Sequence, residues 1–149
     1  MKSVFVTGAD RGVGFALCQQ FVEHGWKVYA GQFMPEWSEL KGLQESCGEQ
    51  VEMIPLNAAD TESVRAAADI VAKRTESLDM LVNCAGIGGM DDDRVAMRAV
   101  FHVNTLGPMR MVEAFLPLMR TGLKRLCFVS SEAGSISVAH RTDSFAYCM

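Results

Sequence analysis

Three glycines within seven residues stand directly after the first apolar run of the chain: Gly8, Gly12 and Gly14. The run Lys2–Thr7 is typical of a buried strand, and the stretch Arg11–His24 has the apolar spacing of a helix. A turn that leads from a strand into the start of a helix offers free N–H groups and the positive end of the helix dipole. We therefore interpret it as a pyrophosphate-binding turn rather than a plain connection, because glycines let phosphates approach the backbone.

Short apolar runs and longer amphipathic stretches alternate along the rest of the chain. The predicted strands are Lys2–Thr7, Trp26–Gly31, Val51–Leu56, Leu78–Asn83 and Leu126–Ser130. The predicted helices are Arg11–His24, Thr61–Thr75 and Thr105–Thr121, the last with Pro117 as a possible break. Such alternation predicts an α/β fold, a Rossmann-type doubly wound parallel sheet. We assign residues 1–149 to one dinucleotide-binding domain.

Composition excludes several other classes of protein. The net charge of −4 argues against nucleic acid as a partner, and no apolar run approaches the ~18 residues that span a membrane. The five cysteines (Cys18, Cys47, Cys84, Cys127 and Cys148) form no Cys-x-x-Cys pair, so we expect reduced thiols and a cytoplasmic location. We expect no metal site either, because the run Asp91–Asp93 points to different faces and suits a helix start.

The glycine spacing is Gly-x-x-x-Gly-x-Gly, and three further motifs follow it. They are Asn83-Cys84-Ala85-Gly86, Val103-Asn104-Thr105-Leu106-Gly107 and Ser130-Ser131-Glu132-Ala133-Gly134. In this order they resemble the short-chain dehydrogenase/reductase family over the whole chain. Within that family, Ser130 to Ser137 and the 16 positions from Ser131 to Tyr147 are similar to C-factor and sniffer-like carbonyl reductases.

The resemblance implies hydride transfer between a nicotinamide cofactor and a small carbonyl or alcohol substrate. It implies Tyr147 as general acid/base, Ser131 as hydrogen-bond donor to the substrate oxygen, and Asn104 as anchor of a water in the proton path. Structural alternatives remain open: Tyr147 as a packing aromatic and Ser131 as a cap. The cofactor-binding residues that it implies are Gly8, Asp10, Arg11, Gly12, Val13, Gly14, Gln32, Asn57, Ala58, Asn83, Ala85 and Gly86.

The residues after the second predicted strand favour NADP over NAD, although NAD stays possible. An acid there would hydrogen-bond the ribose of NAD, and this chain has Gln32 instead. Arg11 is similar to the basic residue of NADP-preferring members, whereas Phe33 stands where such members often carry Arg. Asn57 replaces the family's usual Asp beside the adenine, and its amide oxygen can accept the same bond.

The resemblance also predicts an incomplete site and fold. The family's Tyr-x-x-x-Lys would place a lysine after Met149, the last residue of the sequence. We therefore expect the 149 residues alone to be inactive, truncated after about five strands, and a homo-oligomer only when complete. The alternatives are a catalytically dead fragment, or a cofactor-sensing or scaffold protein. An extended-family epimerase is disfavoured, because its glycines are spaced differently.

Overall fold

The computed structural model describes residues 1–88, 93–137 and 147. Within them, five parallel strands form one sheet in the order β3-β2-β1-β4-β5. The strands are β1 (Ser3–Val6), β2 (Lys27–Gln32), β3 (Val51–Pro55), β4 (Met80–Asn83) and β5 (Arg125–Phe128). The α/β fold with a doubly wound parallel sheet is confirmed. The order reverses between β1 and β4, where sheets of this type bind ligands beyond the carboxyl ends of the strands.

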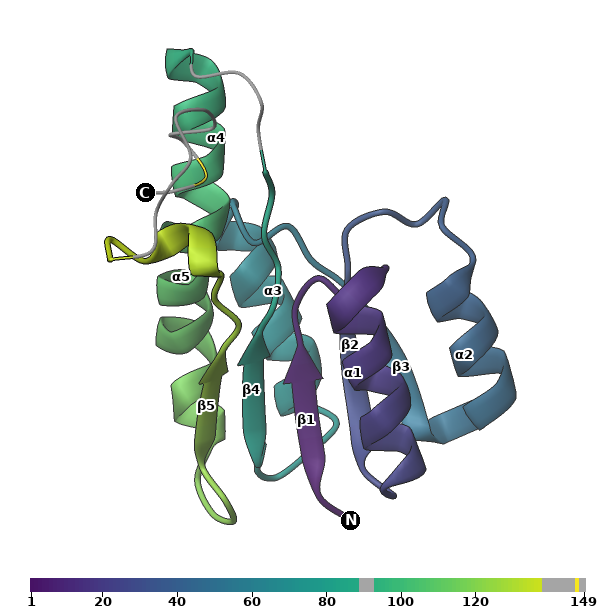
Figure 1. Cartoon of the computed structure of the whole chain (residues 1–149). Helices are drawn as coiled ribbons and strands as arrows, with labels where there is room; N and C mark the ends of the chain where they lie inside the picture. Colours follow the sequence, from purple (N-terminus) through teal and green to yellow (C-terminus); the bar gives the residue numbers. More distant parts are fainter. Residues whose placement is uncertain (89–92, 138–146, 148–149) are drawn as a thin grey trace.

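The helices cover the two faces of the sheet (Figure 1). They are α1 (Gly12–Glu23), α2 (Glu39–Cys47), α3 (Thr61–Ala72), α4 (Arg94–Asn104) and α5 (Leu106–Phe115). Short 3-10 turns at Gly48–Gln50, Leu116–Leu118 and Glu132–Gly134 complete the described elements. Helices α1 and α2 lie on one face, and α3 and α5 lie on the other.

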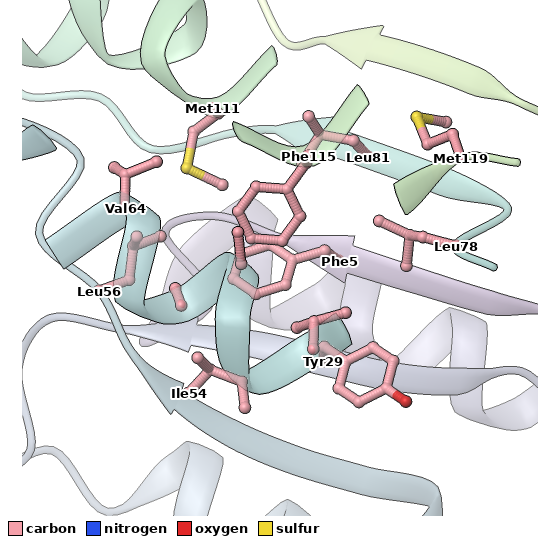
Figure 2. Packing of buried hydrophobic residues seen from close by; sticks show 13 residues of the cluster. Phe5, Tyr29, Ile54, Leu56, Val64, Leu78, Leu81, Met111, Phe115 and Met119 are labelled. Carbon is pink, nitrogen blue, oxygen red and sulfur yellow. The ribbon is translucent and has the colours of Figure 1, made fainter. Parts of the chain in front are cut away.

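Alternate residues of each strand supply the two cores. Phe5, Tyr29 and Leu81 point toward α3 and α5, where Phe5 meets Phe115 with ring centroids 4.5 Å apart (Figure 2). Val4, Val28 and Val82 point toward α1 and α2. The central strands are therefore buried on both faces, which explains why they contain little polar alternation.

Most predicted bounds differ from the structure by a few residues, and two predictions of helices need a larger correction. The stretch Thr105–Thr121 is not one helix, because α5 ends at Phe115 and the 3-10 turn Leu116–Leu118 with Pro117 follows. Helix α4 was not among the predicted helices, although the run Asp91–Asp93 suited a helix start, and helix α2 is missing from the sequence-based expectations altogether. Its segment has a polar composition interrupted by Gly42, and only the buried face formed by Leu40 and its neighbours identifies it.

Strand β5 forms an edge of the sheet within the described residues. It pairs only with β4, and most of its side chains are exposed, including Phe128 at 56%. Leu126 alone packs partly against the core beside α5. Most of the predicted cofactor-binding residues lie away from this edge, at the carboxyl ends of β1, β2 and β3, whereas Asn83 of β4 pairs with Phe128 of β5.

Candidate functional site

The glycine-rich turn is closed by contacts between backbone atoms. Gly8 has a φ of 65°, and a Cβ at Gly8 would lie 2.8 Å from the Cα of Ala85. A Cβ at Gly14 would lie only 2.1 Å from the carbonyl oxygen of Gly8. These two glycines therefore let the start of α1, the end of β1 and the turn after β4 pack together.

Gly12 has a different role in the same turn. Its φ of 56° belongs to the left-handed region, and a Cβ there would meet nothing within 4 Å. It is the first residue of α1, and Arg11 before it makes no side-chain capping bond. By contrast, Asp60 caps α3 and Asp93 caps α4 through their carboxylates. The start of α1 thus keeps donors available for an anion, which is what a pyrophosphate requires.

Thr7 joins the two turns that follow β1 and β4. Its hydroxyl oxygen accepts hydrogen bonds from the backbone N–H groups of Cys84 and Ala85, both at 2.9 Å. Its own N–H donates to the carbonyl oxygen of Val82. Thr7 is buried, so these bonds fix the relative position of the turns before any ligand binds.

A cavity of about 570 Å³ opens beyond the carboxyl ends of these strands. Most of the predicted cofactor-binding residues line it: Gly8, Asp10, Arg11, Gly12, Val13, Gly14, Asn57, Ala58, Ala85 and Gly86. The lining residues that the sequence-based prediction omitted are Gly31, Phe33, Met34, Trp37, Leu56, Cys84, Ile87 and Val103. A volume of this size falls within the range of small-molecule and cofactor sites. The cavity and the open space beside Gly12 together suit an extended dinucleotide.

Gln32 and Asn83 do not line this cavity. The amide nitrogen of Gln32 lies 3.7 Å from the sulfur of Met53 on β3. Asn83 is buried, and its carbonyl oxygen accepts a bond from Val129 on the β5 side. The link between strands therefore comes from its backbone, since its side-chain amide has no partner within the described residues.

Asp10 braces the segment that follows β2. Its carboxylate accepts hydrogen bonds from the N–H groups of Phe33, at 2.9 and 3.2 Å, and of Met34, at 3.1 Å. The carboxylate beside this segment thus belongs to Asp10 of the glycine-rich turn and not to the end of β2, where an acid would favour NAD. Asp10 is only 5% exposed, and the amide dipoles offset its charge.

Arg11 lies at the rim of the cavity and is exposed. Its guanidinium stands over the ring of Trp37, 4.5 Å from the centroid. This distance is well inside the roughly 6 Å that defines a cation–π contact. An anion entering from solvent therefore meets the exposed positive charge of Arg11 before the buried carboxylate of Asp10.

Asn57 and Ala58 follow the carboxyl end of β3 and line the cavity there. The side-chain oxygen of Asn57 accepts a bond from the N–H of Ala59, and its N–H donates to the hydroxyl of Ser63. Asn57 therefore shapes the entry into α3, and its oxygen keeps a second lone pair that faces no described donor. Gly107 on α5 packs closely against Ala58.

Asn104 at the end of α4 holds the loop that follows β4. Its side-chain oxygen accepts from the N–H of Ile87, and its amide donates to the carbonyl of Ile87, both at 2.8 Å. Tyr147 is half-buried, and a Cβ at Gly88 would lie 3.8 Å from its ring. The structure thus brings Asn104 and Tyr147 to the same short loop.

Ser131 follows β5 at the same end of the sheet. Its hydroxyl oxygen accepts a bond from the N–H of Ala133 at 3.1 Å, so it caps the 3-10 turn Glu132–Gly134. The cap expected as a structural alternative is present. Because the hydroxyl uses only a lone pair in this bond, its hydrogen is available to another acceptor.

Two thiols lie beside the site. Burial raises the pKa of Cys18 to about 12, with a smaller contribution from Cys84. Burial also raises the pKa of Cys84, which lines the cavity. Both are therefore neutral thiols near pH 7 and act as packing groups there.

The remaining sequence-based expectations concern metals and membranes. Asp93 caps α4 as predicted, whereas Asp91, Asp92 and Cys148 lie outside the described residues. The described residues contain no cluster of three His, Cys, Asp or Glu side chains arranged to hold a metal. None of the helices described is long and apolar enough to cross a membrane.

Comparison with known proteins agrees with this geometry. A family model described as short chain dehydrogenase matches residues 2–147. The chain belongs to the short-chain dehydrogenase family, whose members are NAD(P)-dependent oxidoreductases.

Individual relatives extend beyond this chain. It is 35% identical over 151 residues to short-chain dehydrogenase anuI of Penicillium roqueforti, covering 95% of this chain and 60% of that protein. It is 32% identical over 163 residues to (+)-neomenthol dehydrogenase of Arabidopsis thaliana, covering 88% of this chain and 54% of that protein. The structure of NADPH-bound carbonyl reductase from chicken fatty liver matches with a TM-score of 0.87 and 28% identity, covering 99% of this chain and 68% of that one.

Proposed function

We propose that this chain is the cofactor-binding part of an NADP(H)-preferring oxidoreductase that interconverts a small carbonyl and its alcohol. The main observation in support is the cavity beyond β1, β2 and β4. It is lined both by the uncapped start of α1 and by the exposed cation of Arg11. The first suits a pyrophosphate, and the second suits a further phosphate on the adenosine ribose.

The preference for NADP over NAD rests on the difference in exposure between two neighbouring residues. Asp10 is buried and its oxygens are engaged by Phe33 and Met34, so it offers little to a ribose hydroxyl. Arg11 is exposed, and no described side chain pairs with it as an ion pair. The similarity to a carbonyl reductase that binds NADPH supports the same choice.

The chemistry would use the three residues around the loop after β4 and the end of β5. The nicotinamide, when bound, supplies or accepts the hydride. The hydroxyl of Tyr147 would give a proton to the carbonyl oxygen of the substrate, and Ser131 would donate a hydrogen bond to the same atom. Asn104 would support this arrangement by holding Ile87 and by anchoring a water in the proton path.

Other properties of the whole protein follow from the same proposal. The substrate is a small molecule of the kind that carbonyl reductases take, and the likeness to C-factor and sniffer-like members stays a prediction. We also propose a cytoplasmic protein that forms homo-oligomers through surfaces including α4.

The test is a comparison of cofactor binding and turnover in the whole protein. NADPH is expected to bind at least tenfold more tightly than NADH, which corresponds to about 1.4 kcal/mol. Equal affinities, or tighter binding of NADH, contradict the proposed preference.

Turnover separates an enzyme from a cofactor sensor. The whole protein is expected to reduce small aldehydes or ketones with NADPH, and Tyr147→Phe is expected to lower kcat by about 100-fold or more while leaving NADPH affinity nearly unchanged. Tight NADPH binding without turnover of a panel of small carbonyls favours the sensor instead. Full turnover by the Tyr147→Phe variant rules out the assigned acid.

A further inference from the structure

The stacking of Arg11 on Trp37 leaves the guanidinium free to bind an anion. A cation placed over an aromatic ring is attracted by the face of the ring, and this contact needs no hydrogen bond from the guanidinium N–H groups. No described residue accepts a hydrogen bond from the Arg11 side chain in the structure, and both residues line the same cavity. The pair therefore presents a fixed, planar set of donors at the cavity rim.

The backbone segment that carries Trp37 is held by hydrogen bonds that do not involve the indole ring. The backbone N–H of Trp37 donates to the carbonyl oxygen of Met34 at 3.1 Å, and this bond closes the turn after β2. Asp10 fixes the N–H groups of Phe33 and Met34 in the same segment. Removing the aromatic ring thus leaves the backbone of this segment with all its described hydrogen bonds.

An unsupported arginine at a surface loses much of its side-chain freedom when it binds a phosphate. The half-buried Trp37 ring restricts Arg11 before binding and so lowers that loss. A phosphate on the adenosine ribose would gain from this support, whereas a ribose hydroxyl forms a weaker bond with the cation and would gain less.

We infer that Trp37 is a positioning residue that strengthens NADPH binding over NADH binding by holding the Arg11 guanidinium at the cavity rim. This inference rests on the proposed preference for NADP(H). It assigns part of that preference to an aromatic residue that lies 26 positions from its cation in the sequence.

The experiment measures NADPH and NADH dissociation constants for the whole protein and five variants. Trp37→Leu is expected to lower the NADPH:NADH affinity ratio about two- to fivefold, the range that an exposed cation–π contact supports. Trp37→Phe keeps an aromatic face and is expected to restore most of the ratio. Arg11→Ala is expected to abolish the preference, and Trp37→Leu added to Arg11→Ala is expected to cause no further change in the ratio.

Phe33→Leu is the matched control, because Phe33 is an exposed aromatic residue of the same cavity wall that makes no described cation contact. It is expected to change the ratio less than Trp37→Leu does, because Phe33 makes no described contact with the Arg11 guanidinium. An equal fall in the NADPH:NADH ratio for Phe33→Leu and Trp37→Leu would overturn the inference, since the loss of any aromatic side chain from the cavity would then lower the ratio.

The remaining outcomes distinguish the inference from the proposed function. If the unmodified protein shows no preference, both are overturned. If it prefers NADPH, loses that preference with Arg11→Ala and keeps it with Trp37→Leu, only the role of Trp37 is overturned.

A spectroscopic measurement covers the case in which Trp37→Leu fails to fold. In a Trp26→Phe variant, Trp37 is the only tryptophan of this sequence. Adenosine 2′,5′-bisphosphate at saturation is expected to change its fluorescence more than adenosine 5′-monophosphate does, because only the first ligand engages Arg11. Equal changes with the two nucleotides would overturn the inference.

Discussion

The replacement of Gly14 by alanine tests how closely the glycine-rich turn is packed. The added Cβ would lie 2.1 Å from the carbonyl oxygen of Gly8, which is a backbone atom and not the end of a flexible side chain. Carbon and oxygen atoms in close contact lie about 3.3 Å apart, so the two segments must separate by roughly 1 Å. The variant is therefore expected to destabilise the fold rather than only to weaken cofactor binding.

The magnitude follows from two opposing effects. Forcing additional atoms into a packed region costs about 3 kcal/mol where the neighbours are backbone. Alanine gains about 1 kcal/mol over glycine inside a helix, and Gly14 lies in α1. The net loss in the free energy of unfolding is about 2 kcal/mol, a large part of the roughly 5–15 kcal/mol typical of a domain.

Gly42 supplies the matched control within the same chain. It lies inside α2, and a Cβ there would meet nothing within 4 Å. Gly42→Ala therefore keeps the helical gain without the clash and is expected to stabilise by about 1 kcal/mol. Urea unfolding of the whole protein without cofactor, followed by circular dichroism, compares the two variants.

The two substitutions are thus expected to differ in sign and by about 3 kcal/mol. If Gly14→Ala and Gly42→Ala change the free energy of unfolding by the same amount, the close backbone packing at Gly14 is refuted. Such a result would mean that Gly14 serves only the approach of a ligand.

Two further predictions concern buried polar groups. Asp10→Ala removes the acceptor for the N–H groups of Phe33 and Met34 and is expected to cost about 2 kcal/mol in urea unfolding, with faster amide hydrogen exchange at both positions. Unchanged exchange would show that the brace is unimportant. Burial raises the pKa of Cys18 to about 12, so its stabilising effect is full below the unfolded pKa near ~8.5 and is lost as the pH rises toward 12. Cys18→Ala is expected to reduce the fall in stability between pH 8 and pH 10 by about 2 kcal/mol, and an equally steep fall in both proteins would contradict this.

The parallel sheet and the place of the candidate site were predictable from local sequence. The glycine spacing from Gly8 to Gly14 and the short apolar runs identified a parallel sheet with its ligand at the carboxyl ends of the strands. The run Asp91–Asp93 indicated a helix start in the same way, and Asp93 caps α4 in the structure. These features depend on neighbours within a few residues, and sequence patterns report such neighbours directly.

The tertiary structure determines the different roles of the three glycines Gly8, Gly12 and Gly14. In the sequence, all three glycines share the same expected role beside a pyrophosphate. In the fold, Gly8 and Gly14 allow close backbone packing, and only Gly12 leaves space for a ligand. The difference arises because the turn after β4 approaches Gly8 from a segment more than 70 positions away.

The residues around the end of β2 and the glycine-rich turn show the same distinction. The sequence determined that β2 ends without an acid, at Gln32, and that a basic residue, Arg11, precedes Gly12. Only the fold brought Asp10 against the segment after β2 and Trp37 against Arg11. These contacts join residues more than 20 positions apart, and their pairing depends on β1 and β2 lying side by side in the sheet. The spacing of residues within one segment of the sequence does not identify such contacts, because they depend on how whole strands and helices pack against one another.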